Sequence, residues 1–381
     1  MRRFALLLAP ILLAGPSEAA SKTVDVKLIA LEAQASELAP ATRAIIDRAK
    51  KGNPRAQNRL GEMYENGEGV EQSFEEAIKW YQLAAEAGIA EAQLNLGALY
   101  ENGEGVARDD RQAAAWYQLA AAQDDILAQL SLGVMYREGR GVEQNNRKAF
   151  ELFEAIADRG FAVGQINLAF LYLDGLGVKR NEMKAAALFS RAALRNHPVA
   201  QNNLGLLFEQ GRGLPENQEK AAMWFRRASD QGLPNGQFNL ARLLEDGRGL
   251  PPDRGQAAAL YLKAAEQGEA RAQRRLGLLN LEGVDGVPNI EKAIEWLSRA
   301  AKNKDPEAQL QLGILLSGNR VGEEQPVEGY IWVSLAHRHA QSDSLRADAE
   351  AKLKELETRL SPSQLSEAEA RVSAWRPSDG S

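Results

Sequence analysis

A glutamine followed three residues later by a leucine recurs along the chain at a constant spacing of 36 residues. The leucines run in step from Leu60 to Leu312, and each is followed by Gly or Ala. Eight copies in one register predict a repeat architecture, in which each unit buries its apolar face against its neighbours. The repeated glutamines are Gln57, Gln93, Gln129, Gln165, Gln201, Gln237, Gln273 and Gln309.

Each copy contains two helical patterns separated by glycines. In the first copy, Leu60 and Tyr64 lie at helical spacing, and Gly61 provides a small residue where a neighbouring helix can come close. The helix is expected to end at Gly67-Glu68-Gly69, because glycine adopts the positive φ that terminates helices. A second helix then carries Trp80 and Tyr81 with small alanines around them. The pattern predicts one helix pair per repeat.

The start of the second helix is marked by a column of short polar residues. Their side-chain oxygens can accept a hydrogen bond from an unpaired backbone N–H of the first helical turn. These residues are Ser73, Asp109, Asn145, Asn181, Asn217, Asp253 and Asn289.

Both ends of the repeat array carry additional helical patterns. Ala41 to Gly52 aligns with the second helix of the first copy, within an N-terminal segment 20–52. After the eight repeats (53–340), leucines from Leu345 to Leu360 and a pattern after Ser361 predict capping helices over 341–376, with a tail at 377–381. The chain is therefore predicted to be all-α, a right-handed superhelical α-solenoid of about eight 36-residue helix-turn-helix repeats with N- and C-terminal capping helices.

The first residues resemble a secretory signal. Arg2 and Arg3 precede an apolar run from Phe4 to Ala14, and Ser17-Glu18-Ala19 is a small-x-small cleavage pattern. The run is too short to span a bilayer. We expect residues 1–19 to be removed, a periplasmic mature protein without a membrane span, and secretion as the alternative. The chain has no cysteine, so neither a lipid-anchored cysteine nor a disulfide is expected.

Charge argues against nucleic acid as a partner. Residues 1–19 hold two arginines and one glutamate, so the mature chain keeps 44 basic and 51 acidic side chains, a formal charge of −7. A nucleic-acid-binding protein needs a basic face that neutralises phosphates. The partners expected are proteins.

Residues 54–88 resemble the Sel1-like repeat, a relative of the tetratricopeptide repeat with a longer Gly-x-Gly loop. The segment reads Pro-Arg-Ala-Gln-Asn-Arg-Leu-Gly-Glu-Met-Tyr-Glu-Asn-Gly-Glu-Gly-Val and then, from Ala77, Ala-Ile-Lys-Trp-Tyr-Gln-Leu-Ala-Ala-Glu-Ala-Gly. The resemblance covers about residues 53–340 and suggests an exported bacterial member. The loops of copies seven and eight, from Gly283 and from Gly318, depart from the pattern.

The resemblance to tetratricopeptide repeats implies that the first helices line a concave, partner-binding face. Three positions of each repeat would project into it: one after the glutamine, two before the glutamine, and two after the leucine. We call these the groove positions. In copies two to five they, and the asparagines two after the glutamine, supply the predicted partner-binding residues. The alternative is that these side chains fill the packing between helices. The predicted residues are Leu94, Leu127, Leu130, Val134, Val163, Ile166, Phe170, Val199, Leu206, Asn167 and Asn203.

No catalytic, cofactor or metal site is predicted. The only histidines are His197, His337 and His339, and alternate residues on one helix point to different faces. The Gly-x-Gly motifs follow helices, whereas a dinucleotide-binding loop follows a strand. Acidic residues such as Glu65, Glu68 and Glu101 are expected to be solvated.

The functional expectation is a protein-interaction scaffold or regulator. Similar exported proteins regulate sensor kinases or assist envelope and polymer-export assembly, so the resemblance implies a role in envelope or exopolysaccharide regulation. A secreted effector that binds host proteins is the alternative. A β-lactam-binding or cell-wall enzyme is a further one, although members linked to β-lactams are cysteine-rich and this chain has no cysteine.

Overall fold

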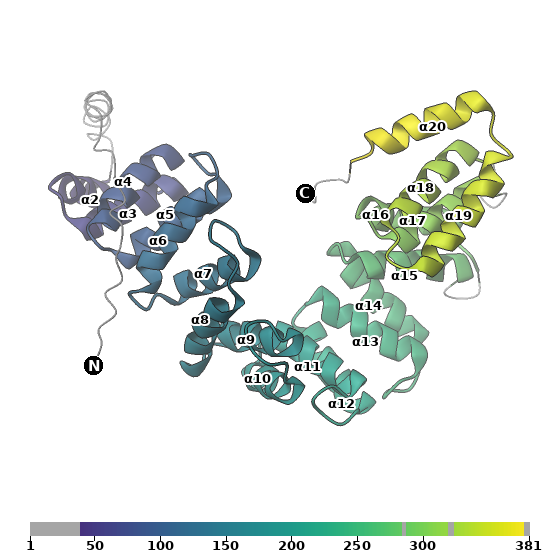
Figure 1. Cartoon of the computed structure of the whole chain (residues 1–381), viewed down its shortest axis with the longest axis horizontal. Helices are drawn as coiled ribbons and strands as arrows, with labels where there is room; N and C mark the ends of the chain where they lie inside the picture. The colour runs from purple at the N-terminus through teal and green to yellow at the C-terminus, as the bar shows by residue number, and fades with distance from the viewer. Residues whose placement is uncertain (1–38, 284–286, 319–323, 377–381) are drawn as a thin grey trace. The chain divides into compact units, whose positions relative to one another are not determined.

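The computed structural model describes residues 39–283, 287–318 and 324–376. These residues form helices and connecting loops, with no strand among them, as predicted for an all-α protein. Figure 1 shows the helices in chain order. The predicted signal segment 1–19 and the tail 377–381 lie outside the described residues.

The helices alternate between two kinds, a first and a second helix in each repeat. The first helices are α3 (Pro54–Asn66), α5 (Ala90–Asn102), α7 (Ile126–Glu138), α9 (Ala162–Asp174), α11 (Pro198–Gln210), α13 (Pro234–Asp246), α15 (Ala270–Glu282) and α17 (Pro306–Ser317). The second helices are α4 (Phe74–Glu86), α6 (Asp110–Ala121), α8 (Asn146–Asp158), α10 (Glu182–Leu194), α12 (Gln218–Asp230), α14 (Arg254–Glu266), α16 (Ile290–Lys302) and α18 (Pro326–His339).

The chain forms two compact units, one up to Leu152 and one from Phe153 onward. Within each unit, helices that follow each other in the chain pack side by side, as α3 and α4 or α11 and α12 do. The predicted stack of 36-residue helix pairs is confirmed inside each unit.

The predicted capping column is confirmed at every position. Asn181 accepts a hydrogen bond from the backbone N–H of Lys184, for example, and Asp253 accepts one from Gln256. Ser73, Asp109, Asn145, Asn217 and Asn289 make the same contact with their own helices. Each bond satisfies one N–H that the helix itself leaves unpaired, so the short polar residue fixes where the second helix begins.

The Gly-x-Gly loop has two separate structural causes. The first glycine ends the helix in the left-handed conformation, as at Gly67 with φ 71°. The second glycine lies against the start of the second helix in the preceding repeat. A Cβ atom on Gly213 would collide with the backbone of Glu182, and one on Gly249 with the backbone of Gln218. The loop therefore ends a helix and also packs against the second helix of the preceding repeat.

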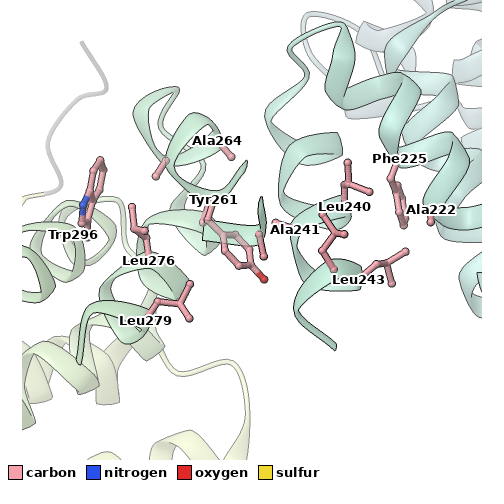
Figure 2. Packing of buried hydrophobic residues seen from close by; sticks show 14 of the residues in the cluster. Ala222, Phe225, Leu240, Ala241, Leu243, Tyr261, Ala264, Leu276, Leu279 and Trp296 are labelled. Atoms are coloured by element: carbon pink, nitrogen blue, oxygen red, sulfur yellow. The ribbon is translucent and has the colours of Figure 1, made fainter. Parts of the chain in front are cut away.

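The interior is built from large side chains placed against small ones. Figure 2 shows Tyr261 of α14 with Leu240 and Leu243 of α13 on one side and Leu276 of α15 on the other. Tyr261 is 1% exposed, and the alanines beside it allow the helices to approach closely. Burying such apolar area is the main favourable contribution to folding.

In several copies the repeated glutamine links three consecutive helices. Gln93 donates from Nε2 to the backbone oxygen of Ala85 at the end of α4, at 3.0 Å. Its Oε1 accepts from Nε2 of Gln123 after α6, at 2.8 Å. Gln273 makes equivalent contacts with Ala265 and Asn303. The glutamine therefore serves the fold: it adds a second hydrogen bond to a helix-end carbonyl that also accepts one from a following backbone N–H, as Ala85 does from Gly88 and Ala265 from Gly268.

Additional helices close both ends, as predicted. At the N-terminal end, helix α2 (Pro40–Lys50) packs on α3. At the other end, α19 (Asp343–Glu357) and α20 (Pro362–Ala374) both pack on α18. The ring of His339 lies 5.5 Å from the ring of Trp375, which follows α20, and Nδ1 of His339 is 3.0 Å from Oε1 of Gln309. His339 thus occupies the position that Gln123, Gln231, Gln267 and Asn303 occupy in other repeats.

The last two loops differ from the others, as their sequences indicate. Gly283 has φ 83° and ψ 111°, outside the left-handed helical region, and Gly318 has φ −99°. Residues 284–286 and 319–323 of these loops lie outside the described residues. The helices on either side still pair in the usual way, because a Cβ on Gly313 would stand 2.5 Å from the side chain of Val333.

Candidate partner-binding face

Four of the predicted partner-binding residues belong to the first unit. Leu127, near the start of α7, is 58% exposed, which is unusual for a large apolar side chain. Leu94, Leu130 and Val134 are half-buried. These four groove positions therefore present apolar surface to solvent, and Leu127 is the most accessible of them.

The remaining apolar candidates belong to the second unit, and two of them contribute to its packing. Ile166 is 6% exposed and lies in the interior. Phe170 is half-buried and its ring meets the buried ring of Phe189 edge to face, with centroids 5.3 Å apart. Val163, Val199 and Leu206 are half-buried at the surface. For Ile166 the contacts match the helix-packing alternative.

The two predicted asparagines use their amides within their own helices. Nδ2 of Asn167 donates to the backbone oxygen of Val163 at 2.9 Å, and Nδ2 of Asn203 donates to Val199 at 2.8 Å. Each bond spans one helical turn. These contacts occupy one of the two amide hydrogens of each residue, so pairing with a peptide backbone would use the other.

The groove positions of copies six and seven line a hollow of about 280 Å³ in the second unit. It opens between α13 and α15. Phe238, Arg242, Arg271, Arg274 and Leu278 all stand at groove positions and line its wall. The other lining residues are Glu245, Asp246, Tyr261 and Arg275. The repeat positions that supply the predicted residues in copies two to five are thus mainly aromatic and basic in copies six and seven, where they line this hollow.

Two of the hollow's arginines pair with carboxylates that are largely covered. Arg242 contacts Glu209 of α11 at 2.7 Å, and the Glu209 side chain is 8% exposed and also pairs with Arg248. Arg275 donates from Nε to both carboxylate oxygens of Glu245 at 3.0 Å. The planar guanidinium suits such two-oxygen contacts. These pairs hold the arginine heads in fixed places along the hollow.

Two lining residues of the hollow, Glu245 and Tyr261, are joined by a hydrogen bond. The Tyr261 hydroxyl donates to Glu245 at 2.9 Å. Burial raises the pKa of Tyr261, and the neighbouring Glu245 charge raises it further. Burial also acts to raise the pKa of Glu245, but the hydrogen bonds from Arg275 and Tyr261 outweigh it and the net pKa is lowered. Glu245 therefore stays charged, with its oxygens already occupied by donors.

The remaining two arginines of the hollow, Arg271 and Arg274, differ in the exposure of their ion pairs. Arg271 lies over the ring of Phe238, 4.5 Å from its centroid, and contacts Glu269 at 2.7 Å. Its side chain is 47% exposed. Arg274 contacts Asp305 at 3.2 Å and also pairs with Glu307. Half-exposed pairs such as that of Arg271 contribute little to stability, so the Arg271 guanidinium can exchange partners at small cost, whereas the partner of Arg274, Asp305, is only 9% exposed.

A second hollow of about 270 Å³ adjoins the first. Arg274 and Leu278 line both, so the two hollows are neighbours along the same face. The second is completed by Glu307 and Leu310, again at groove positions, and by residues of α17 and the α19 region. The remaining lining residues are Gln311, Ser342, Ser344, Leu345 and Asp348.

The expectation that Glu65 and Glu101 are simply solvated is wrong. Glu65 accepts a hydrogen bond from the Tyr81 hydroxyl, and Glu101 accepts one from Tyr117 at 2.8 Å. Buried tyrosines need a hydrogen-bond partner for the hydroxyl, and the glutamate sixteen residues earlier supplies it. The recurrence of this spacing was the available signal. Glu68, in contrast, forms an exposed ion pair with Arg59.

The chain belongs to the Sel1 repeat family. The sequence profile of the Sel1 repeat matches seven consecutive segments, 54–89, 90–125, 126–161, 162–197, 198–233, 234–269 and 270–305. Sel1-repeat proteins are protein-interaction scaffolds. The eighth predicted copy, which contains Gln309, lies beyond the matched segments, although its helices pair in the same manner.

Two solved structures resemble the chain over most of its length. One is a protective antigen of uropathogenic Escherichia coli strains that displays an SLR fold, with 31% identity and a TM-score of 0.55, covering 87% of this chain and 79% of that one. The other is a Sel1 repeat protein from Oxalobacter formigenes, with 29% identity and a TM-score of 0.60, covering 86% and 93%. Comparison with curated proteins gave no match.

Within the described ranges, none of the helices combines the length and the apolar character that crossing a membrane requires.

Proposed function

We propose that this protein is an exported, non-catalytic interaction scaffold that holds a segment of a partner protein against its first helices. The observation that supports the proposal is that residues at the groove positions are accessible to a partner. In the second unit they line both hollows, and in the first unit they leave Leu127 exposed. Exposed apolar residues and hollows are typical of surfaces that bind peptide segments.

The N-terminal sequence supports export. Its basic start, apolar run and small-x-small end are the features that secretion machinery reads, so we propose a periplasmic location for the mature protein. A role in envelope or exopolysaccharide regulation follows from the resemblance to exported members of the family. Cell fractionation tests the location: recovery in the periplasmic fraction supports it, and recovery in the medium favours a secreted effector.

Proximity labelling in the producing cell tests the binding face. A labelling enzyme active in the periplasm is fused after Ser381, and the wild type is compared with Leu127→Asp. The charge placed on an exposed apolar contact should remove a defined set of labelled partners. Leu119→Asp is the matched control, because Leu119 is 50% exposed on the second helix α6.

The two variants separate the possible results. Partners lost in Leu127→Asp and kept in Leu119→Asp support binding on the first helices. Partners lost only in Leu119→Asp would move the binding surface to the second helices. An identical labelled set in all three proteins would overturn the proposal.

A further inference from the structure

The arginine-lined hollow between α13 and α15 differs in chemistry from the rest of the groove positions. In copies three to five these positions carry Leu, Val, Ile and Phe almost throughout. In copies six and seven they carry Arg242, Arg271 and Arg274, together with Phe238 and Leu278. A change from aliphatic to guanidinium side chains at equivalent positions changes what the face can recognise.

The lining of the hollow has more positive than negative groups. Four arginines line it against two carboxylates, and one of those, Glu245, already accepts hydrogen bonds from Arg275 and Tyr261. The opposing carboxylates of Glu209 and Asp305 lie outside the lining and are 8% and 9% exposed. Arg271, Arg274 and Arg275 also pair with Glu269, Glu307 and Glu282, which lie outside the lining. A partner carboxylate would therefore share these guanidinium groups or replace one of the exposed carboxylates.

The arginines also offer unused donors. A guanidinium has five N–H groups in a planar fork that fits a carboxylate. Arg271 stacks on Phe238, which fixes the plane of its guanidinium while leaving nearly half of the side chain exposed. A partner carboxylate placed here would meet donors that are already oriented, next to the aromatic ring of Phe238 and the apolar Leu278.

The neighbouring hollow indicates that the ligand continues past this point. Arg274 and Leu278 line both hollows, so a chain that fills them runs along the face and does not end in the first hollow. This favours a side-chain carboxylate within an extended segment over the carboxylate of a chain terminus.

We propose that the hollow formed by Phe238, Arg242, Arg271 and Arg274 binds an acidic side chain, Asp or Glu, flanked by an apolar residue, within an extended segment of the partner protein. This inference rests on the proposed function and names the partner chemistry at one part of the same face. The acidic group forms charge-assisted hydrogen bonds with the guanidinium groups, and the flanking residue covers Leu278.

The test is selection from a displayed library of random peptides on the mature protein. Peptides enriched on the wild type should contain Asp or Glu beside an apolar residue. The double variant Arg242→Gln with Arg271→Gln should lose this enrichment. Arg299→Gln should keep it, because Arg299 is an exposed, ion-paired arginine of α16 in the same unit and does not line the hollow. Circular dichroism checks that each variant is folded.

A second arm leaves the protein unchanged. An enriched peptide is remade with its acidic residue replaced by the matching amide, and both peptides are titrated by fluorescence anisotropy. The amide peptide should bind about tenfold more weakly, and the affinity of the acidic peptide should fall as salt is added. This arm remains decisive even where an arginine variant fails to fold.

Three results would overturn the inference: enrichment of apolar peptides without acidic residues, equal binding of the acidic and amide peptides, or no enrichment that depends on the two arginines. None of these results contradicts the proposed scaffold function, which is judged separately by loss of labelled partners in Leu127→Asp.

Discussion

The ring of Tyr81 lies against Gly61, so that a Cβ atom on the glycine would stand 2.6 Å from the tyrosine Cδ1. The same relationship recurs between Gly97 and Tyr117 and between Gly205 and Phe225. The small residue after the repeated leucine therefore leaves room for the large side chain twenty positions later. This contact joins the two helices of one repeat.

Gly61→Ala should consequently destabilise the protein although alanine favours helices. The added methyl group must push back a tyrosine that is fully buried, and overpacking of this kind costs about 1–3 kcal/mol. Urea unfolding of the wild type and the variant measures the difference in free energy. Gly255→Ala is the control: Gly255 is exposed in α14, and its added Cβ meets only Asp253 at 3.5 Å. That variant should be as stable as the wild type or slightly more so.

Lys304→Gly should stabilise the second unit. Lys304 has φ 63°, a left-handed conformation that costs an ordinary residue about 1–2 kcal/mol, whereas glycine adopts it freely. Because glycine also loses more chain entropy on folding, the net gain should be about 0.5–1 kcal/mol.

The equivalent position one repeat earlier provides the reciprocal test. Gly268 has φ 89° with open space around it, so Gly268→Lys should lower stability through the backbone alone. Thermal unfolding of both variants measures the two effects. Equal melting temperatures for Lys304→Gly, Gly268→Lys and the wild type would contradict the argument.

Arg195→Gln should also raise stability. Oε1 of Gln165 is buried and has no hydrogen-bond partner among the described residues. The residue thirty positions later supplies that donor in other repeats, as Gln231 does for Gln201 at 2.7 Å, but here Arg195 donates to the backbone oxygen of Gly160.

The exposed Gly160 contact can be replaced by water, while an unpaired buried oxygen costs about 1–3 kcal/mol. We expect a net gain of about 1 kcal/mol for Arg195→Gln, measured by urea unfolding. Arg191→Gln, an exposed change on the same helix α10, should have no effect. A decrease in stability for Arg195→Gln would show that the Gly160 contact dominates.

The C-terminal end should be less stable in mild acid. Burial, Arg338 and Lys304 lower the pKa of His339 below its usual value of about 6.5. The folded protein therefore binds fewer protons at this site than the unfolded chain. The stabilising contribution is complete above the unfolded pKa and is lost as the pH falls through about 6.5 toward the folded pKa.

NMR titration of the His339 ring measures this pKa directly. Trp375→Ala, which uncovers the ring, should move the pKa back toward its usual value. His337→Gln provides the control for overlapping histidine signals. A His339 pKa at or above 6.5 in the wild type would refute the prediction.

Much of the fold could be predicted because the same local sequence pattern recurs from one repeat to the next. Two of these patterns can be recognised in the sequence and each has a direct structural cause. They are the capping residues from Ser73 to Asn289 and the small residue Gly61, which lies against Tyr81. The role of the repeated glutamine was not predictable in the same way. Its partners lie eight residues before and thirty residues after it, and a recurring residue alone does not show which atoms it contacts.

The residues that line the two hollows were not among the predicted partner-binding residues. The groove positions were chosen where they carry Leu130 or Phe170, because apolar residues are the usual sign of a binding surface. The same positions in copies six and seven carry Arg242 and Arg274 and are the ones that line a hollow. The signal in the sequence is the change from apolar to basic residues at these positions between copies five and seven.

The glutamine contacts also set how this protein can change in length. Every such contact joins a repeat to its immediate neighbour at fixed offsets, as Gln201 to Ala193 and Gln231 to Gln201 illustrate. Loss of residues 234–269 as one block would bring Gln273 into the position of Gln237, facing Ser229, with every offset preserved. A loss whose length is not a multiple of 36 residues would leave a buried amide facing a different atom. Whole repeats can therefore be gained or lost, and with them segments of the binding face, while partial repeats cannot.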